Sequence, residues 1–257
     1  MRASLGFMFM LMMVLSGCQG VGEPQRSLSG FGPIDPSLTE RLKPSLEGDW
    51  WLVLVDGDEP RRVAISGGNG KEWTILYEAK DGWTGYGVGI IERDGTLYFD
   101  LRDLKQERFS RFSVPTYVFG TLDFSEHSLI ARVVADHSPS DAADYKIDGL
   151  VFHEFAAGIN ERTSLRAFDP SDEREVLKFD ELDSQVITSG SNEAIREFVI
   201  AACRNEQFLM LPIILTREPF QLQEGWSPDQ IRSALRAHDD WLGERINSMR
   251  TGQGDLE

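Results

Sequence analysis

The stretch 92–102, which reads ERDGTLYFDLR, decides the fold that the sequence predicts. Asp94-Gly95 is a dipeptide preferred in two-residue hairpin turns, because both of its residues adopt positive φ at low cost. Beyond this turn the apolar side chains of Leu97, Phe99 and Leu101 alternate with those of Tyr98, Asp100 and Arg102. A period of two directs one side of a strand into the core and the other side away from it. The stretch therefore predicts an antiparallel hairpin with a half-buried second strand.

Short strands separated by turns continue on both sides of this hairpin. The predicted strands cover residues 49–55, 61–66, 85–92, 108–119, 127–135, 145–157 and 162–168. Another strand begins at Trp73, and Ile75 and Tyr77 are its next alternating residues. Many short strands with tight turns are typical of a sandwich or a barrel. Consecutive hairpins favour an up-and-down meander, and closure into a barrel removes its exposed edges. We therefore predict a mainly β fold with an antiparallel up-and-down barrel domain over residues 45–216, and other β architectures are the alternative.

The last third of the chain combines helices with strands. Ser191 is a favourable N-cap and Glu193 places a negative charge in the first turn, so we expect a helix over 191–203. Residues 208–215 form a dense apolar run that predicts a buried strand, which Pro212 assigns to an edge or a bulge. Both elements belong to the predicted barrel domain.

Residues 217–257 are expected to form a C-terminal amphipathic helix and a tail. Ser227 and Pro228 make a strong helix start, with the serine as N-cap and the proline in the first turn. One apolar stripe follows, made of Ile231, Ala234, Leu235, Trp241, Leu242, Ile246 and Met249. Such a stripe packs on its own domain or, as the alternative, on a partner helix or a membrane surface.

The first eighteen residues have the pattern of an export signal. Arg2 gives a positive start, residues 5–15 are an almost unbroken apolar run, and Leu15-Ser16-Gly17-Cys18 follows. The run is too short to cross a bilayer, which takes about 20 residues. A short apolar run before small residues is typical of a secretory signal. The segment resembles the signal peptide of bacterial lipoproteins, with Leu15-Ser16-Gly17-Cys18 as the lipobox.

This resemblance implies a location in the bacterial cell envelope. Residues 1–17 are then cleaved and Cys18 becomes the lipid-modified first residue, anchored by acyl chains such as palmitate. In enteric bacteria Asp after the cysteine favours the inner membrane, so Gln19 favours the outer membrane, facing the periplasm. Residues 18–44 are rich in Gly, Pro and Ser, and we predict a flexible tether there, within which residues 37–42 can form a short helix.

Charge and cysteine content narrow the classes of partner. The chain has 26 Lys+Arg against 42 Asp+Glu, a net charge of −16, and this acidity argues against a nucleic-acid partner. It also gives no attraction to anionic lipid heads, so the membrane contact is expected through the covalent lipid on Cys18. Cys203 is the one other cysteine, which leaves no internal disulfide once Cys18 carries lipid. We interpret Cys203 as a small buried hydrophobe rather than a nucleophile.

Gly48-Asp49-Trp50 opens the first predicted strand of the domain. A Gly-x-Trp at this place resembles the first signature of lipocalins. Asp144-Tyr145 stands near the interval at which lipocalins carry Thr-Asp-Tyr, although Ala143 replaces the threonine. The resemblance covers residues 46–205 at most. It implies a lipocalin-like barrel of eight strands, followed by a helix.

The lipocalin resemblance also implies how the barrel closes. In that family the tryptophan closes one end of the barrel, packed under an Arg or Lys from the last strands. Gly48 and Trp50 are then structural residues, and Arg162, or alternatively Arg166, is the candidate cation over Trp50. Such a cation–π contact is worth about 0.5–2 kcal/mol.

No motif in the sequence indicates a reaction. The chain has four histidines, and no two of them stand at the spacing of a metal-binding helix motif. His137 beside Asp136 and His153 beside Glu154 are the best metal candidates, but neighbours in a strand point to opposite faces. The sequence contains neither a Gly-x-Ser-x-Gly elbow nor a complete phosphate loop. We therefore predict no catalytic residue, no metal site and no cofactor.

Aromatic residues on the predicted strands are the candidate ligand-binding residues. A barrel interior can hold one apolar molecule, although such side chains can also simply fill the core. The candidates are Trp73, Tyr77, Tyr86, Phe99 and Phe119. The sequence thus favours a non-enzymatic, lipid-anchored envelope protein that binds a small hydrophobic ligand. The alternatives are a module that docks on another envelope protein and a cryptic hydrolase.

Overall fold

The computed structural model describes much of the chain, and every structural statement below concerns the described residues. They are residues 24–55, 61–67, 72–79, 82–103, 116–125, 127–157, 163–172, 184–205, 208–210, 212–219 and 221–222. The predicted signal peptide, Cys18 and the predicted helix that begins at Ser227 lie outside these ranges. Within them, no helix is long and apolar enough to cross a membrane.

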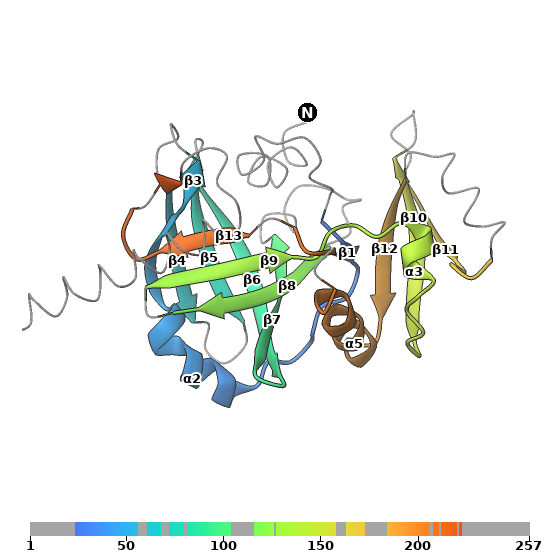
Figure 1. Cartoon of the computed structure of the whole chain (residues 1–257), viewed down its shortest axis with the longest axis horizontal. Coiled ribbons are helices and arrows are strands. Elements are labelled where there is room, and N and C mark those ends of the chain that lie inside the picture. The colour runs from blue at the N-terminus through green and yellow to red at the C-terminus, as the bar shows by residue number, and fades with distance from the viewer. Residues whose placement is uncertain are drawn as a thin grey trace, which may run out of the picture.

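A closed antiparallel barrel forms the centre of the described structure (Figure 1). Each barrel strand pairs antiparallel with its neighbours, and the last strand, β13, pairs with both β9 and β2. The prediction of a mainly β fold with an antiparallel barrel is confirmed. The eight strands are β2 (Gly48–Leu52), β4 (Arg61–Gly67), β5 (Trp73–Ala79), β6 (Gly82–Arg93), β7 (Thr96–Asp103), β8 (Tyr117–Phe124), β9 (Ser128–Val133) and β13 (Ile213–Thr216).

Seven of the barrel strands follow one another up and down, but the eighth does not. Between β9 and β13 the chain leaves the barrel and builds an extension from β10 (Leu150–Ala157), β11 (Thr163–Phe168) and β12 (Ser184–Gly190). The N-terminal strand β1 (Arg26–Ser27) joins this extension to the barrel, because it pairs with β12 on one side and β8 on the other. The segments predicted at 145–157 and 162–168 therefore do contain strands, but these strands lie outside the barrel.

Strand β8 is the branch point between the barrel and the extension. Its first residues, Tyr117 and Val118, pair with β1, whereas Gly120 and the residues after it pair with β9. At Gly120 a Cβ atom would lie 2.0 Å from the carbonyl oxygen of Arg132, so no larger residue fits where the partner strands diverge. A separate pair of short strands, β3 (Leu54–Val55) and β14 (Gln221–Leu222), lies next to the barrel and runs parallel.

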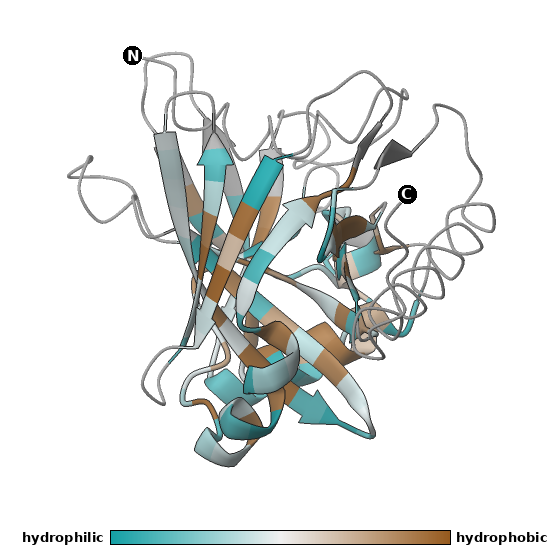
Figure 2. Ribbon diagram, turned by 90° about the vertical axis from the view of Figure 1, so that its left-hand side faces the viewer, coloured by the Kyte–Doolittle hydropathy of each residue, from teal (hydrophilic) through white to brown (hydrophobic). Residues whose placement is uncertain are grey.

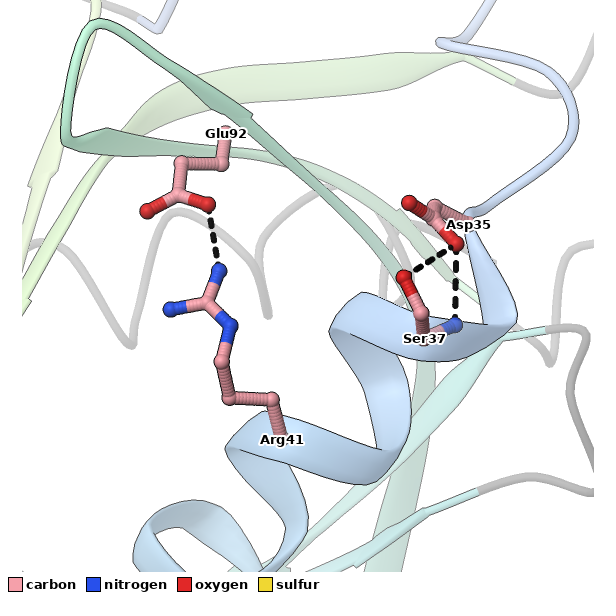
Figure 3. A network of polar contacts seen from close by, with 4 residues as sticks. All are labelled: Asp35, Ser37, Arg41 and Glu92. Carbon is pink, nitrogen blue, oxygen red and sulfur yellow. Dashed lines mark hydrogen bonds and ion pairs between the residues drawn. The ribbon is translucent and has the colours of Figure 1, made fainter.

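Helix α2 (Pro36–Leu46) packs against one end of the barrel. Asp35 is its N-cap, because the Asp35 carboxylate accepts hydrogen bonds from the amide and the hydroxyl of Ser37, both at 2.8 Å (Figure 3). On the side facing the barrel, Leu42 and Leu46 are buried in the barrel core. An ion pair between Arg41 and Glu92 joins the exposed side of the helix to β6. The short helix predicted at 37–42 is confirmed, and it continues to the first strand of the barrel.

A second hydrophobic core lies outside the barrel wall. Helix α5 (Asn192–Cys203) sits between the barrel and the extension, and Ser191 caps it as predicted by accepting a hydrogen bond from the amide of Ala194 at 3.1 Å. Its buried face includes Ile195 and Phe198, which the aromatic residues of the extension cover. The short helix α3 (Pro139–Ala142) contributes Ala142 to the same core. The extension is therefore held by its own apolar core as well as by backbone pairing.

The described part of the predicted tether is folded, which corrects the expectation of a flexible segment over 18–44. Phe31 has no exposed surface, and its ring stacks on Phe119 with centroids 5.7 Å apart.

The amide of Phe31 donates to the Asp100 carboxylate at 2.5 Å, and the amide of Gly89 donates to the same group at 2.7 Å. Burial raises the pKa of Asp100. Gly30 is needed here, because a Cβ atom would lie 2.5 Å from the Asp100 carboxylate. Glycine and proline thus give an irregular path along the barrel wall.

We predict that Phe31→Ala lowers the free energy of unfolding by about 3 kcal/mol, because it removes a fully buried aromatic side chain. Urea denaturation measures the effect. Pro33→Ala is the matched control, since Pro33 belongs to the same segment but is exposed. If both variants were as stable as the wild type, the segment would be a tether in solution.

Candidate functional site

The barrel interior is the candidate site, because it encloses an apolar cavity of about 120 Å³. Every second side chain along a barrel strand faces the interior. Figure 2 shows apolar positions recurring along the strands between more polar ones. Leu46 of α2 lines the cavity at one end. The strand residues that line it are Leu52, Val63, Ile65, Trp73, Ile75, Tyr77, Tyr86, Val88, Ile90, Phe99, Leu101, Val118, Leu122, Leu129, Ala131, Val133, Ile213 and Leu215.

Four of the five predicted ligand-binding residues are in this wall. Trp73, Tyr77, Tyr86 and Phe99 line the cavity and are almost completely buried. Phe119 does not line it. Its neighbour Val118 faces the interior, so Phe119 faces outward and stacks on Phe31 in the second core. Val118 and Leu122 share the inner face of β8, and this period of two, which places Phe119 on the outer face, is the signal that sequence reasoning missed.

The cavity is narrow for a binding site. Pockets for drug-sized ligands measure about 300–1,000 Å³. An engineered apolar cavity of about 150 Å³ in another protein stays dry and holds benzene. At about 120 Å³, this barrel has room for one small ring or a slim alkyl segment. Most of the interior is filled by its own side chains, as the core-filling interpretation of the aromatic residues predicts, and binding by these residues stays a prediction.

Polar groups occur at separate places around the apolar wall. The indole N–H of Trp73 is buried and has no hydrogen-bond partner among the described residues. Leaving such a donor unpaired costs about 1–3 kcal/mol. On β4, Arg61 donates to the hydroxyl of Tyr77 at 2.6 Å and lies 5.9 Å from the ring centroid. Tyr77 is thus already paired, and the Trp73 donor is buried in the wall.

Trp50 closes the barrel through a cation that the sequence analysis did not identify. The guanidinium carbon of Arg217 lies 3.7 Å from the centroid of the Trp50 ring, and the Trp50 indole donates to the Leu46 carbonyl at 2.8 Å. Arg162 lies outside the described residues. Arg166 is on the extension and forms an ion pair with Glu154 at 3.3 Å. Arg217 immediately follows β13. The cation could therefore have been sought at the end of the strand predicted at 208–215.

Gly48 is required by this arrangement. Its φ of +123° is a conformation that residues with a side chain rarely adopt. A Cβ atom at Gly48 would also lie 2.9 Å from the guanidinium nitrogen Nη1 of Arg217. The Gly-x-Trp pair therefore combines a backbone turn that admits the arginine with the ring on which it stacks.

A buried polar network lies in the second core, away from the cavity. The ring nitrogens of His137 are 3.2 Å from the side-chain oxygen of Gln25 and 2.8 Å from the hydroxyl of Tyr145. Gln25 in turn donates to the Val186 carbonyl at 2.8 Å. Burial lowers the pKa of His137 and raises that of Tyr145 to about 12, so both groups are neutral at pH 7. We interpret this network as a structural link between the N-terminal segment and the extension.

The remaining candidates for chemistry are dispersed. In the described ranges, no group of three or more His, Cys, Asp or Glu side chains could hold a metal ion. His153 lies 2.7 Å from the hydroxyl of Ser189 on the neighbouring strand, and burial lowers the pKa of His153. Burial also raises the pKa of the Cys203 thiol to about 12. The thiol therefore stays protonated at neutral pH, which makes it a poor nucleophile.

No family model, curated protein or solved structure matches this chain. The geometry of the barrel and its surroundings therefore carries the functional argument.

Proposed function

We propose that the protein is a non-enzymatic lipoprotein of the bacterial envelope, anchored through Cys18, whose barrel binds a slim apolar molecule. The observation that carries the proposal is the closed barrel with an all-apolar wall and an unfilled cavity. The lipobox supplies the location, and the barrel supplies the binding site. The outer membrane, facing the periplasm, is the location that Gln19 favours.

The unfilled cavity supports binding because a void is costly for a protein core. Protein interiors are close-packed, and voids larger than a water molecule are few. At about 24 cal/mol per Å³, a cavity of about 120 Å³ costs about 3 kcal/mol of stability. Larger side chains would remove that cost, and a ligand offsets it.

The folded N-terminal segment keeps the barrel close to its anchor. Pro24 already pairs with Ala135, so residues 18–23 are all that separates the lipid-modified cysteine from the described fold. Six extended residues span at most about 20 Å. The barrel is then held within about 20 Å of the lipid surface, where apolar molecules are most concentrated.

Docking on another envelope protein is the second candidate. Val151 and Leu165, on β10 and β11 of the extension, are 39% and 43% exposed. Leu76 and Trp83, on β5 and β6 of the barrel wall, are 39% and 44% exposed. Large exposed apolar side chains that gather on a surface are typical of interaction sites.

The anchor is tested by fractionation of cells that express the chain. We expect the wild type to sediment with the membranes and to carry the mass of its acyl chains, whereas Cys18→Ser loses both properties. Cys203→Ser is the matched control and keeps them, because Cys203 is not in the lipobox. A Cys18→Ser protein that still carries acyl chains would contradict the proposal.

The binding site is tested by filling the cavity. Ala131 lines it, so we expect Ala131→Leu to weaken binding of 1-octanol at least about tenfold. The same variant is expected to unfold at higher urea concentration, because it fills a void. Titration calorimetry on the mature chain, residues 18–257 with Cys18→Ser, measures the binding.

Ala64→Leu is the control for this experiment, since Ala64 lies between two cavity-lining residues of β4 and so faces away from the cavity. It should leave the octanol affinity unchanged. Equal octanol affinity in the wild type and Ala131→Leu would show that the cavity is not the site.

A further inference from the structure

A second hollow lies on the outer wall of the barrel, at the end that α2 covers. It is a groove of about 600 Å³ between α2, the turn from β6 to β7, strands β8 and β9, the end of α5 and Leu209. Polar and apolar side chains share its wall. They are Arg41, Leu42, Glu92, Gly95, Thr96, Leu97, Thr121, Leu122, Asp123, Phe124, Arg132, Cys203, Arg204 and Leu209.

The charges of the groove differ from those of the chain as a whole. Three arginines, Arg41, Arg132 and Arg204, line it together with two carboxylates, Glu92 and Asp123. The chain as a whole has 26 basic against 42 acidic residues. With three arginines and two carboxylates in its wall, the groove is therefore less acidic than the chain as a whole. Guanidinium groups bind carboxylates and phosphates through paired hydrogen bonds.

Two of the three arginines form exposed ion pairs. Arg41 pairs with Glu92, as Figure 3 shows, and Arg204 pairs with Asp94 at 3.5 Å. The Arg204 and Asp94 side chains are 67% and 75% exposed. Exposed pairs of this kind contribute little to stability, so the arginines can exchange their partners for an anion at little cost.

The groove meets the barrel cavity at one side chain. Leu122 belongs to the wall of the groove and also to the wall of the cavity. Leu97 and Phe124 continue the apolar part of the groove next to it. At Leu122 the groove with its arginines therefore lies next to the apolar interior.

We propose that the groove binds the anionic head group of an amphiphile, a carboxylate or a phosphate, whose apolar chain reaches the barrel cavity past Leu122. This inference rests on the proposed function and specifies its ligand class. The arginines bind the head group, the apolar part of the groove at Leu97 and Phe124 contacts the first part of the chain, and the cavity takes its end. The protonated thiol of Cys203 forms an unreactive part of the wall.

The test compares three probes on the mature chain, residues 18–257 with Cys18→Ser. Decyl phosphate has both the head group and the chain, 1-decanol has the chain without the charge, and inorganic phosphate has the charge alone. We expect decyl phosphate to bind at least about tenfold more tightly than either of the others, because charge-assisted hydrogen bonds add to the burial of the chain. Titration calorimetry measures each affinity.

Single variants separate the two parts of the site. Arg204→Gln is expected to weaken decyl phosphate about tenfold and to leave 1-decanol unchanged, whereas Ala131→Leu weakens both. Arg62→Gln is the matched control, because Arg62 also forms an exposed ion pair, with Asp49 at 3.5 Å, but lies outside the groove. It should change neither affinity.

The outcomes distinguish this inference from the function on which it rests. If 1-decanol binds in the cavity but Arg204→Gln binds decyl phosphate like the wild type, the groove is not the head-group site and the barrel function stands. If inorganic phosphate binds as tightly as decyl phosphate, the site takes a free anion and the proposed amphiphile is wrong. If Ala131→Leu changes no affinity, the barrel function itself is contradicted.

Discussion

The stacking of Arg217 on Trp50 is the interaction on which the rest of the structure depends. The barrel has to close where β13 meets β2, and the described pairing there consists of two positions, Leu215 with Leu52 and Thr216 with Trp51. Arg217 reinforces this short seam. Its guanidinium covers the Trp50 ring and donates to the carbonyls of Ser45, Glu47 and Asp49, at 2.8, 3.2 and 3.4 Å. One side chain thus joins the last barrel strand to the first strand and to the end of α2.

Closure at this seam also determines where ligands can bind. An open sheet would expose its apolar side to water, whereas the closed barrel encloses it and leaves one narrow cavity. The excursion between β9 and β13 then adds the extension and α5 on the outside. Because α5 ends beside the turn from β6 to β7, its last residues complete the charged groove next to Leu122. The cavity and the groove are both consequences of the same strand order.

The sequence predicted the features that arise from local periodicity. Alternation over 92–102 predicts a hairpin, and the Ser191 cap predicts a helix, because each pattern depends on neighbours in the chain. The cation over Trp50 could not be identified this way. Its identification depends on the pairing of β13 with β2, which closes the barrel and joins segments far apart in the sequence. Arg162 and Arg166 were chosen because the strands of the extension were counted as the last barrel strands.

Two other predictions rest on composition rather than on contacts. Glycine and proline in the segment before α2 predict an irregular backbone, and the backbone is irregular. Composition does not show that Phe31 is buried against Phe119, which only the barrel wall determines. The aromatic character of Phe119 favours the interior, but its position next to Val118 places it on the outer face of β8. For the candidate site, the alternating residues were predictable from sequence, whereas the groove combines segments that are distant in the sequence and was not.

The most direct test of this account is the free energy of unfolding of Arg217→Lys, measured by urea denaturation beside Arg62→Lys. Lysine keeps the positive charge but lacks the planar fork that stacks on the indole and donates to several carbonyls. The account predicts a loss of about 2 kcal/mol for Arg217→Lys, with faster hydrogen exchange in β2 and β13, and almost no change for Arg62→Lys. An Arg217→Lys protein as stable as the wild type, with unchanged exchange at the seam, would contradict it.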